Sequence, residues 1–208
     1  MARLMRALVV VLFVAGMGLW ANTWWQEEKT AQQSAVGAGG VAVPGGVAIG
    51  GHFDLVGADG KPVTDADFRG KVMLVYFGYT FCPDVCPTEL QTIAASLAQL
   101  GDQAAKVAPI FITIDPERDT PQAMGEYVKL FDGRIVGLTG SAEQIASVAK
   151  AYRVYYAKAD AKGASTYLMD HSSFIYVMGP DGGFRSLIKP GAQAADVAQA
   201  LRAQLPHS

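Results

Sequence analysis

Residues 72–87 of the chain read VMLVYFGYTFCPDVCP. Its first six residues, 72–77, form an unbroken apolar run, which is typical of a strand buried on both faces of a sheet. Beyond the quoted stretch, apolar residues recur at helical spacing at positions 90, 93, 94, 97 and 100. The two cysteines, Cys82 and Cys86, therefore lie in a turn between a buried strand and a helix, where α/β proteins place ligands.

Strand and helix patterns continue to alternate after this stretch. Ser141 and Gln144 have the spacing of a capping box, and Pro121 suits the first position of a helix. The order predicts a thioredoxin-like α/β fold with a mixed central sheet and helices on both faces. The further predicted elements are a turn at 58–61, a buried strand at 107–114, helices from 121 and from 141 to about 152, a hairpin of 174–178 with 184–188, and a closing amphipathic helix at 197–205.

The N-terminal segment 7–25, ALVVVLFVAGMGLWANTWW, contains no charged residue. At about 1.5 Å per residue, a helix of this length nearly matches the roughly 30 Å hydrocarbon core of a bilayer. Arg3 and Arg6 precede it, whereas Glu27 and Glu28 follow it. The positive-inside rule therefore predicts a single-pass anchor in the inner (cytoplasmic) membrane, with the N-terminus in the cytoplasm and the soluble domain on the periplasmic side.

A cleaved secretory signal is the alternative interpretation of this segment. Leu19-Trp20-Ala21 matches the small-x-small cleavage pattern poorly, which favours an uncleaved anchor, and both interpretations export the domain. We therefore expect a membrane anchor at 1–28, a flexible linker rich in Ala, Gly, Gln and Ser at 29–50, and the folded domain at 51–208.

Composition argues against nucleic acid as a partner. The 208 residues carry 17 basic and 19 acidic side chains, a formal net charge of −2, and the basic residues form no cluster. Proteins that bind nucleic acid present a basic patch or stripe instead. Hydrophobic residues make up 50% of the chain, which is enough for a globular core.

The cysteine pair predicts thiol chemistry rather than structural cross-linking. A disulfide between Cys82 and Cys86 would close a loop too small to add much stability. Thiols this close serve either disulfide exchange or metal binding. Three residues separate these cysteines, whereas the usual dithiol redox motif has two, so the spacing favours a metal site. Thiolates are soft ligands that select Cu(I) or zinc.

Two thiolates leave such a metal short of ligands, and a histidine is the natural third donor. His207 belongs to the C-terminal tail, and His52 lies at the domain edge, where a solvated surface residue is expected. His171 lies just before an apolar strand and is the remaining candidate, although structural histidines are more common than ligands at such a position. The residues alone leave this choice open.

Four longer motifs bear on whether His171 is a ligand, because together they resemble a known family. Residues 76–87 (YFGYTFCPDVCP), 113–121 (TIDPERDTP), 152–156 (YRVYY) and 170–174 (DHSSF) occur in this order, and the chain resembles the SCO/SenC family of copper proteins from about residue 50 to residue 205. Members of that family serve the assembly of cytochrome c oxidase. The resemblance implies that Cys82, Cys86 and His171 are copper ligands, for Cu(I) and Cu(II).

Several neighbours of this ligand set are candidates to assist it. Asp84 and Asp170 could accept a hydrogen bond that orients the imidazole, or could be plain solvated carboxylates. Met169 could face the same side as His171, although packing is the usual role of methionine. The charged loop 115–120 could dock a partner, or its Asp119 or Thr120 could simply cap the helix that begins at Pro121.

The resemblance implies a copper metallochaperone that delivers its ion to the dinuclear copper site of cytochrome c oxidase subunit II. The alternative is a thiol-disulfide reductase that uses Cys82 and Cys86 as a redox pair and keeps the cysteines of subunit II reduced. Reduced thiols are required for copper loading, so both roles are compatible. An upstream periplasmic copper chaperone or thiol reductase is a further expected partner.

Overall fold

The computed structural model describes residues 17, 40–41, 48–159 and 167–205. Residues 37–208 form one compact unit, and the account below concerns that unit. Most of the predicted anchor at 7–25, most of the predicted linker, and His207 lie outside the described residues. Within the described part of the chain, no helix has the length and apolar character needed to cross a membrane.

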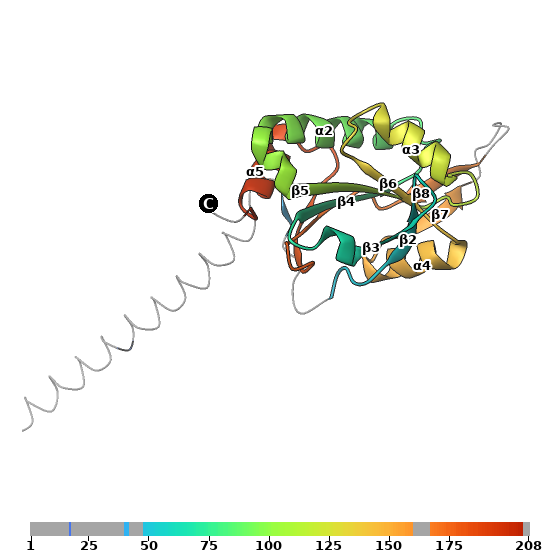
Figure 1. Ribbon diagram of the computed structural model, residues 1–208, viewed down its shortest axis with the longest axis horizontal. Helices are drawn as coiled ribbons and strands as arrows, with labels where there is room; N and C mark the ends of the chain where they lie inside the picture. Colours follow the sequence, from blue (N-terminus) through green and yellow to red (C-terminus); the bar gives the residue numbers. More distant parts are fainter. Residues whose placement is uncertain (1–16, 18–39, 42–47, 160–166, 206–208) are drawn as a thin grey trace, which may run out of the picture. The chain divides into compact units, whose positions relative to one another are not determined.

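The structure confirms the alternation of strands and helices (Figure 1). The strands are β1 (Gly40–Val41), β2 (Asp54–Gly57), β3 (Pro62–Thr64), β4 (Val72–Gly78), β5 (Val107–Thr113), β6 (Val136–Thr139), β7 (Tyr156–Ala159), β8 (Leu168–His171), β9 (Ile175–Met178) and β10 (Phe184–Ile188). The helices are the 3-10 helices η1 (Asp65–Phe68) and η2 (Gly101–Lys106) and the α-helices α2 (Val85–Leu100), α3 (Pro121–Lys129), α4 (Ala142–Ala151) and α5 (Ala194–Arg202).

The main sheet has the strand order β1-β10-β9-β4-β5-β6-β2-β3. β4, β5 and β6 run parallel, whereas the other neighbouring pairs in this sheet are antiparallel. Helices α2, α3 and α5 cover one face of the sheet and α4 covers the other (Figure 1). The predicted mixed sheet with helices on both faces is therefore confirmed.

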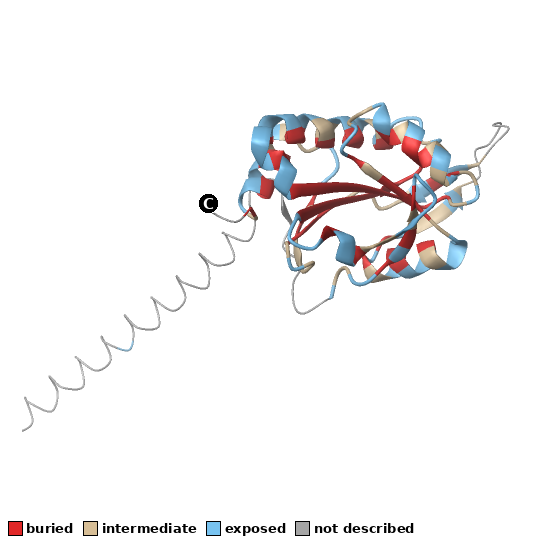
Figure 2. Cartoon of the chain, in the orientation of Figure 1, coloured by how far each residue is buried: buried red, intermediate tan, exposed pale blue. Residues whose placement is uncertain are grey.

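The centre of this sheet is the pair β4 and β5. All seven residues of each strand are buried, as the red central strands in Figure 2 show. Their register runs from Val72 opposite Val107 to Gly78 opposite Thr113, and the Ile114 N–H donates to the Gly78 carbonyl at 2.8 Å. Because the strands are parallel and in register, their carboxyl ends meet at one edge of the sheet.

Six strands were not predicted: β1, β2, β3, β6, β7 and β8. β6 has four residues including a glycine, and β7 reads YAKA with no buried residue, so neither shows a clear apolar period. β7 and β8 pair with each other in a separate two-stranded sheet. β1 lies inside the predicted linker and pairs with β10. These strands are short, and pairing with other strands defines them.

The predicted helix starts are confirmed in detail. Ser141 caps α4 by accepting from the Gln144 N–H at 3.2 Å, and the Gln144 side chain accepts from the Ser141 N–H at 2.8 Å. Thr120 caps α3 by accepting from the Ala123 N–H at 3.2 Å. Of the two cap candidates for α3, Thr120 is therefore the cap, which leaves Asp119 for another role.

A buried carboxylate joins α2 to the loop before α5. Glu89 is 2% exposed, and its Oε1 accepts from the Gly191 N–H at 2.7 Å. Its Oε2 has no hydrogen-bond partner among the described residues. Burial raises the pKa of the Glu89 carboxyl, although the Gly191 N–H opposes that shift.

The raised pKa of Glu89 predicts a specific pH dependence of stability. The folded protein keeps the proton of Glu89 to a higher pH than the unfolded chain, whose glutamate pKa is about 4.3, so this residue lowers stability as pH rises above that value. In Glu89→Gln, this loss should disappear, and the variant should gain stability relative to wild type with increasing pH in urea unfolding. Glu126→Gln, at an exposed glutamate of α3, is the control. Parallel pH curves for wild type and Glu89→Gln would contradict the assignment.

Candidate metal centre

The two cysteines lie where β4 ends and α2 begins. Helix α2 starts at Val85, so Pro87 falls in its first turn, where the missing N–H leaves no helical hydrogen bond unmade. The residues between Cys82 and Val85 form a bent turn, and the turn predicted to hold both cysteines is shorter than expected because Cys86 already belongs to α2. Cys86 is fully buried, whereas Cys82 is partly exposed.

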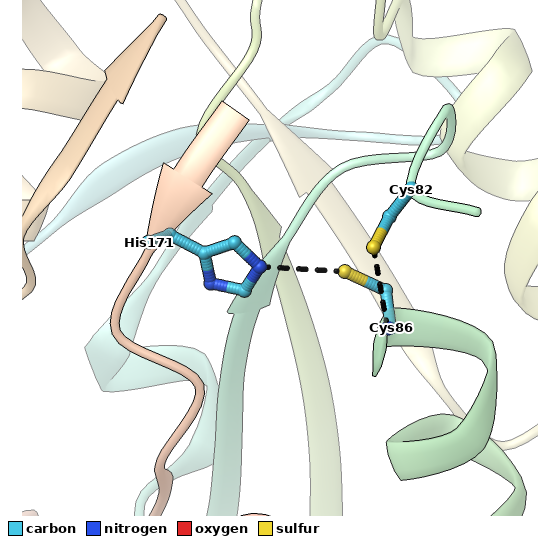
Figure 3. A group of neighbouring side chains, drawn as sticks. All are labelled: Cys82, Cys86 and His171. Atoms are coloured by element: carbon cyan, nitrogen blue, oxygen red, sulfur yellow. Dashed lines mark hydrogen bonds between the residues drawn. The ribbon is translucent and has the colours of Figure 1, made fainter. Parts of the chain in front are cut away.

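The structure brings Cys82, Cys86 and His171 together. Their candidate ligand atoms, two Sγ atoms and one imidazole nitrogen, all lie within 4.8 Å of one another. The Cys86 Sγ lies 3.5 Å from the His171 Nε2, and all three side chains point toward a common space (Figure 3). The other histidine candidate in the described structure, His52, instead contacts Asp65 at 2.7 Å. Of the predicted site residues, these three converge.

The orientation of the His171 ring suits metal binding through Nε2. Its Nδ1 lies 3.1 Å from the Ser172 carbonyl oxygen, which can only accept, so the proton of the neutral ring belongs on Nδ1. The Nε2 lone pair then faces the sulfurs. Neither Asp84 nor Asp170 forms a hydrogen bond with this ring in the described structure. A backbone carbonyl, and not either predicted carboxylate, orients the imidazole.

Aromatic rings enclose the histidine. The rings of Tyr76 and Tyr79 meet the His171 ring edge-on, at centroid distances of 6.3 and 6.1 Å. Tyr76 is fully buried and Tyr79 is 2% exposed, so the side of the site that faces the core is apolar and closed. A metal held here would exchange ligands only from the solvent side.

The two thiols differ in their electrostatics. The pKa of Cys82 is lowered to about 3, chiefly by a hydrogen bond from the Cys86 thiol, with further hydrogen bonds from the backbone. The Cys86 N–H, in the first turn of α2, donates to the Cys82 sulfur at 3.4 Å. The pKa of Cys86 is raised by this neighbour and by burial. Cys82 is therefore the more acidic thiol of the pair, and Cys86 keeps its proton to higher pH.

Met169 lies apart from this arrangement. It is 8% exposed and lines a cavity of about 150 Å³ together with Asp115 and Lys158. Its N–H donates to the Tyr79 hydroxyl at 3.2 Å. The structure thus gives Met169 a packing role and a backbone contact that ties β8 to the cysteine turn.

The charged loop 115–120 supports the cysteine turn from the neighbouring strand. Asp119 is fully buried, and its carboxylate accepts from the Thr80 N–H at 3.1 Å, the Thr80 hydroxyl at 2.5 Å and the Thr113 hydroxyl at 2.6 Å. Thr80 lies two residues before Cys82. Asp119 was predicted only as a possible cap, and the signal for its role was a cluster of charges directly after a buried strand.

Arg118 joins the cysteine turn to the histidine strand. Its guanidinium pairs with Asp115, and its Nη1 donates to the Tyr167 carbonyl at 3.0 Å. The same group lies over the rings of Tyr167 and Phe81, at 3.8 and 4.7 Å. β7 and β8 form no ladder with the main sheet, so side-chain contacts of this kind place His171 against the cysteines.

Comparison with known proteins identifies relatives of this chain. The family model described as SCO1/SenC matches residues 42–206. The Arabidopsis thaliana protein SCO1 homolog 1, mitochondrial, is 43% identical over 180 residues, which cover 84% of this chain and 53% of the relative, so the chain spans about half of that protein. The Bos taurus protein SCO2 homolog, mitochondrial, is 41% identical over 200 residues, 95% of this chain and 74% of the relative.

A solved structure matches as well. The copper-bound structure of Bradyrhizobium japonicum ScoI superposes with a TM-score of 0.71 and 45% sequence identity, covering 76% of this chain and all of that one. The similarity thus extends from sequence to fold.

Gly78, the last residue of β4, packs against the Cys86 sulfur. A Cβ at this position would lie 2.7 Å from the Cys86 Sγ and 2.8 Å from Cε2 of Phe111. Both atoms belong to fully buried side chains, so neither can move away easily. Gly78→Ala should therefore displace the sulfur.

We expect Gly78→Ala to lower the free energy of unfolding by about 1–3 kcal/mol, the usual effect of overpacking, and to weaken Cu(I) binding. Urea unfolding and a competitive Cu(I) titration measure the two effects. Gly133→Ala is the matched control, since a Cβ there would contact nothing within 4 Å. Unchanged stability and Cu(I) affinity in Gly78→Ala would show that the glycine is dispensable.

Proposed function

This chain belongs to the SCO1/SenC family, and we propose that it is a copper metallochaperone. Cys82, Cys86 and His171 are the proposed ligands of the ion, which is the cargo of the protein. The proposed destination is the dinuclear copper site of cytochrome c oxidase subunit II. The main observation behind this proposal is that three donor atoms lie within 4.8 Å of one another. The copper in the structure of the Bradyrhizobium relative supports it.

The donor set favours copper on chemical grounds. Two thiolates are soft ligands, and an imidazole with its Nε2 lone pair turned toward them supplies a third donor. A three-donor site leaves the ion open to one more ligand. Cys82 is partly exposed, so a thiolate of a receiving protein can approach the metal from the solvent side. These features support transfer by stepwise ligand exchange.

Export of the domain also belongs to the proposal. The apolar segment 7–25 and the charges that flank it support a single-pass anchor that holds the copper domain, residues 51–208, at the outer surface of the inner membrane. An anchored carrier would meet subunit II at the same membrane surface. A periplasmic copper chaperone or thiol reductase acting upstream would supply the ion or keep Cys82 and Cys86 reduced.

The role of His171 is tested by His171→Ala in the full-length protein. Loss of a residue that only orients a ligand lowers metal affinity about 10- to 100-fold, so loss of a ligand should cost at least as much. A competitive Cu(I) titration measures the affinity. His52→Ala is the matched control, because the His52 side chain is 73% exposed and contacts Asp65 rather than the cysteines. Wild-type affinity in His171→Ala would refute the ligand assignment.

A thiol-disulfide reductase is the second candidate, and the asymmetry of the two thiols favours it. The Cys82 thiolate would attack a disulfide of the target and form a mixed disulfide. Cys86 would then lose its proton and attack Cys82, which releases the target as a dithiol and leaves a Cys82–Cys86 disulfide. This reaction needs no metal and no histidine.

The two candidates respond differently to substitution. In the metal-free protein, wild type and His171→Ala should both reduce an oxidised peptide that carries the cysteine pair of subunit II, while Cys82→Ser should not. Thiol release from the peptide and the reduction potential of the Cys82–Cys86 pair are the measurements. A potential too oxidising to reduce the peptide would exclude the reductase role and leave copper delivery as the function.

A further inference from the structure

A buried hydroxyl group lies beside the metal centre. Tyr76, in β4, is fully buried, and its hydroxyl oxygen has no nitrogen or oxygen partner for a hydrogen bond among the described residues. Polar groups buried in native proteins are nearly always hydrogen-bonded, since an unpaired one destabilises the fold. The sulfurs of the metal centre are acceptors of another kind, and the position of Tyr76 relative to them accounts for this hydroxyl.

Strand geometry places Tyr76 on the same side of the sheet as the Cys86 sulfur. Successive side chains of a strand alternate between its faces, so Tyr76 and Gly78 share one face of β4. A Cβ at Gly78 would lie 2.7 Å from the Cys86 Sγ, which places this sulfur against that face. The centroid of the Tyr76 ring also lies 6.3 Å from that of the His171 ring. Tyr76 thus borders two of the three proposed ligands.

Two polar groups lie near enough to the Tyr76 hydroxyl to accept its proton in a hydrogen bond. Burial raises the pKa of this hydroxyl, and Cys86 makes the next contribution, ahead of Glu89 and Cys82. Glu89 lies one turn after Cys86 on the buried side of α2, and its Oε1 accepts from the Gly191 N–H. Its Oε2 has no partner among the described residues, so the hydroxyl forms no bond with this carboxyl. The Cys86 sulfur is the acceptor that remains.

The chemistry of sulfur decides when this contact becomes strong. A thiol sulfur is a weak acceptor, whereas hydrogen bonds to ionised acceptors are about twice as strong as bonds between neutral groups. A metal binds cysteine as the thiolate, so the Tyr76 hydroxyl gains a good acceptor when Cys86 holds copper. The bound sulfur carries more negative charge with Cu(I) than with Cu(II). Hydrogen bonding at a cysteine sulfur tunes the potential of bound copper, and a donor here favours Cu(I).

We propose that Tyr76 is a positioning residue of the metal centre, whose hydroxyl donates a hydrogen bond to the Cys86 sulfur when copper is bound. This bond keeps the sulfur in place on the core side of the site. It also strengthens the binding of Cu(I) more than that of Cu(II), because the sulfur accepts more strongly in the Cu(I) state. The proposal rests on the proposed copper carrier and deepens it, since it names a residue that favours one oxidation state of the cargo.

The test uses Tyr76→Phe in the full-length protein in detergent, a variant that removes only the hydroxyl. Its Cu(I) affinity in a competitive titration should fall about 10- to 100-fold, the usual effect of losing a residue that supports a ligand. Its Cu(II) affinity should fall less, so the midpoint potential of the bound copper should drop in a redox titration. The absorption band for charge transfer from sulfur to Cu(II) should move to longer wavelength.

Tyr176→Phe is the matched control. Tyr176 is a buried tyrosine of the neighbouring strand β9, and burial alone raises the pKa of its hydroxyl. It packs against Phe77, the residue after Tyr76, at a centroid distance of 5.8 Å, so it lies on the opposite face of the sheet. Its Cu(I) affinity, Cu(II) affinity and copper potential should all stay at the wild-type values.

A measurement on the metal-free protein separates this role from packing. Because a thiol sulfur is a weak acceptor, metal-free Tyr76→Phe should unfold in urea with a free energy equal to or above that of wild type. Lower metal-free stability, with Cu(I) and Cu(II) affinities reduced equally, would show a packing role and overturn the proposal. Wild-type Cu(I) affinity and copper potential in Tyr76→Phe would also overturn it and leave the metallochaperone standing. Failure of the wild-type protein to bind Cu(I) would overturn the proposed function and, with it, this role of Tyr76.

Discussion

The parallel pairing of β4 and β5 is the constraint on which the rest of the structure depends. Both strands are buried along their whole length, and their register ends with Gly78 opposite Thr113. Parallel, in-register strands end at the same edge, so the cysteine turn and the charged loop 115–120 leave the sheet side by side. Asp119 can therefore reach Thr80 directly, and the position of Cys82 follows from that contact.

The cysteine pair and the histidine are held by different means. The cysteines follow from one continuous run of strand, turn and helix, with Gly78 leaving room for the Cys86 sulfur. His171 comes from the ribbon of β7 and β8, which forms no hydrogen-bonded ladder with the main sheet. Its position depends on side-chain contacts, with Arg118 and the Tyr79 hydroxyl reaching the same strand. His171 is thus held mainly by side-chain contacts, whereas the cysteines are held by the strand and helix on either side of them.

The two sides of the site also differ in their access to solvent. Burial of Cys86 and the enclosing rings of Tyr76 and Tyr79 close the side of the site that faces the core. Cys82 is partly exposed and lies on the solvent side. The pKa of Cys82 is lowered, because the Cys86 thiol and the backbone donate hydrogen bonds to its sulfur. Cys86, whose pKa is raised, is the thiol that a bound metal would have to deprotonate.

The sequence by itself determined the elements whose signals are local: the buried strand before Cys82, the helix after Cys86, the capping box at Ser141 and the mixed sheet with helices on both faces. Tertiary structure alone decided which distant groups meet. Cys86 and His171 are 85 positions apart in the sequence, and no local signal predicts their 3.5 Å approach; the same holds for Asp119 and Thr80. The ligand role of His171 was inferred from family motifs alone, because contacts between remote segments depend on strand register and packing, which no local pattern encodes.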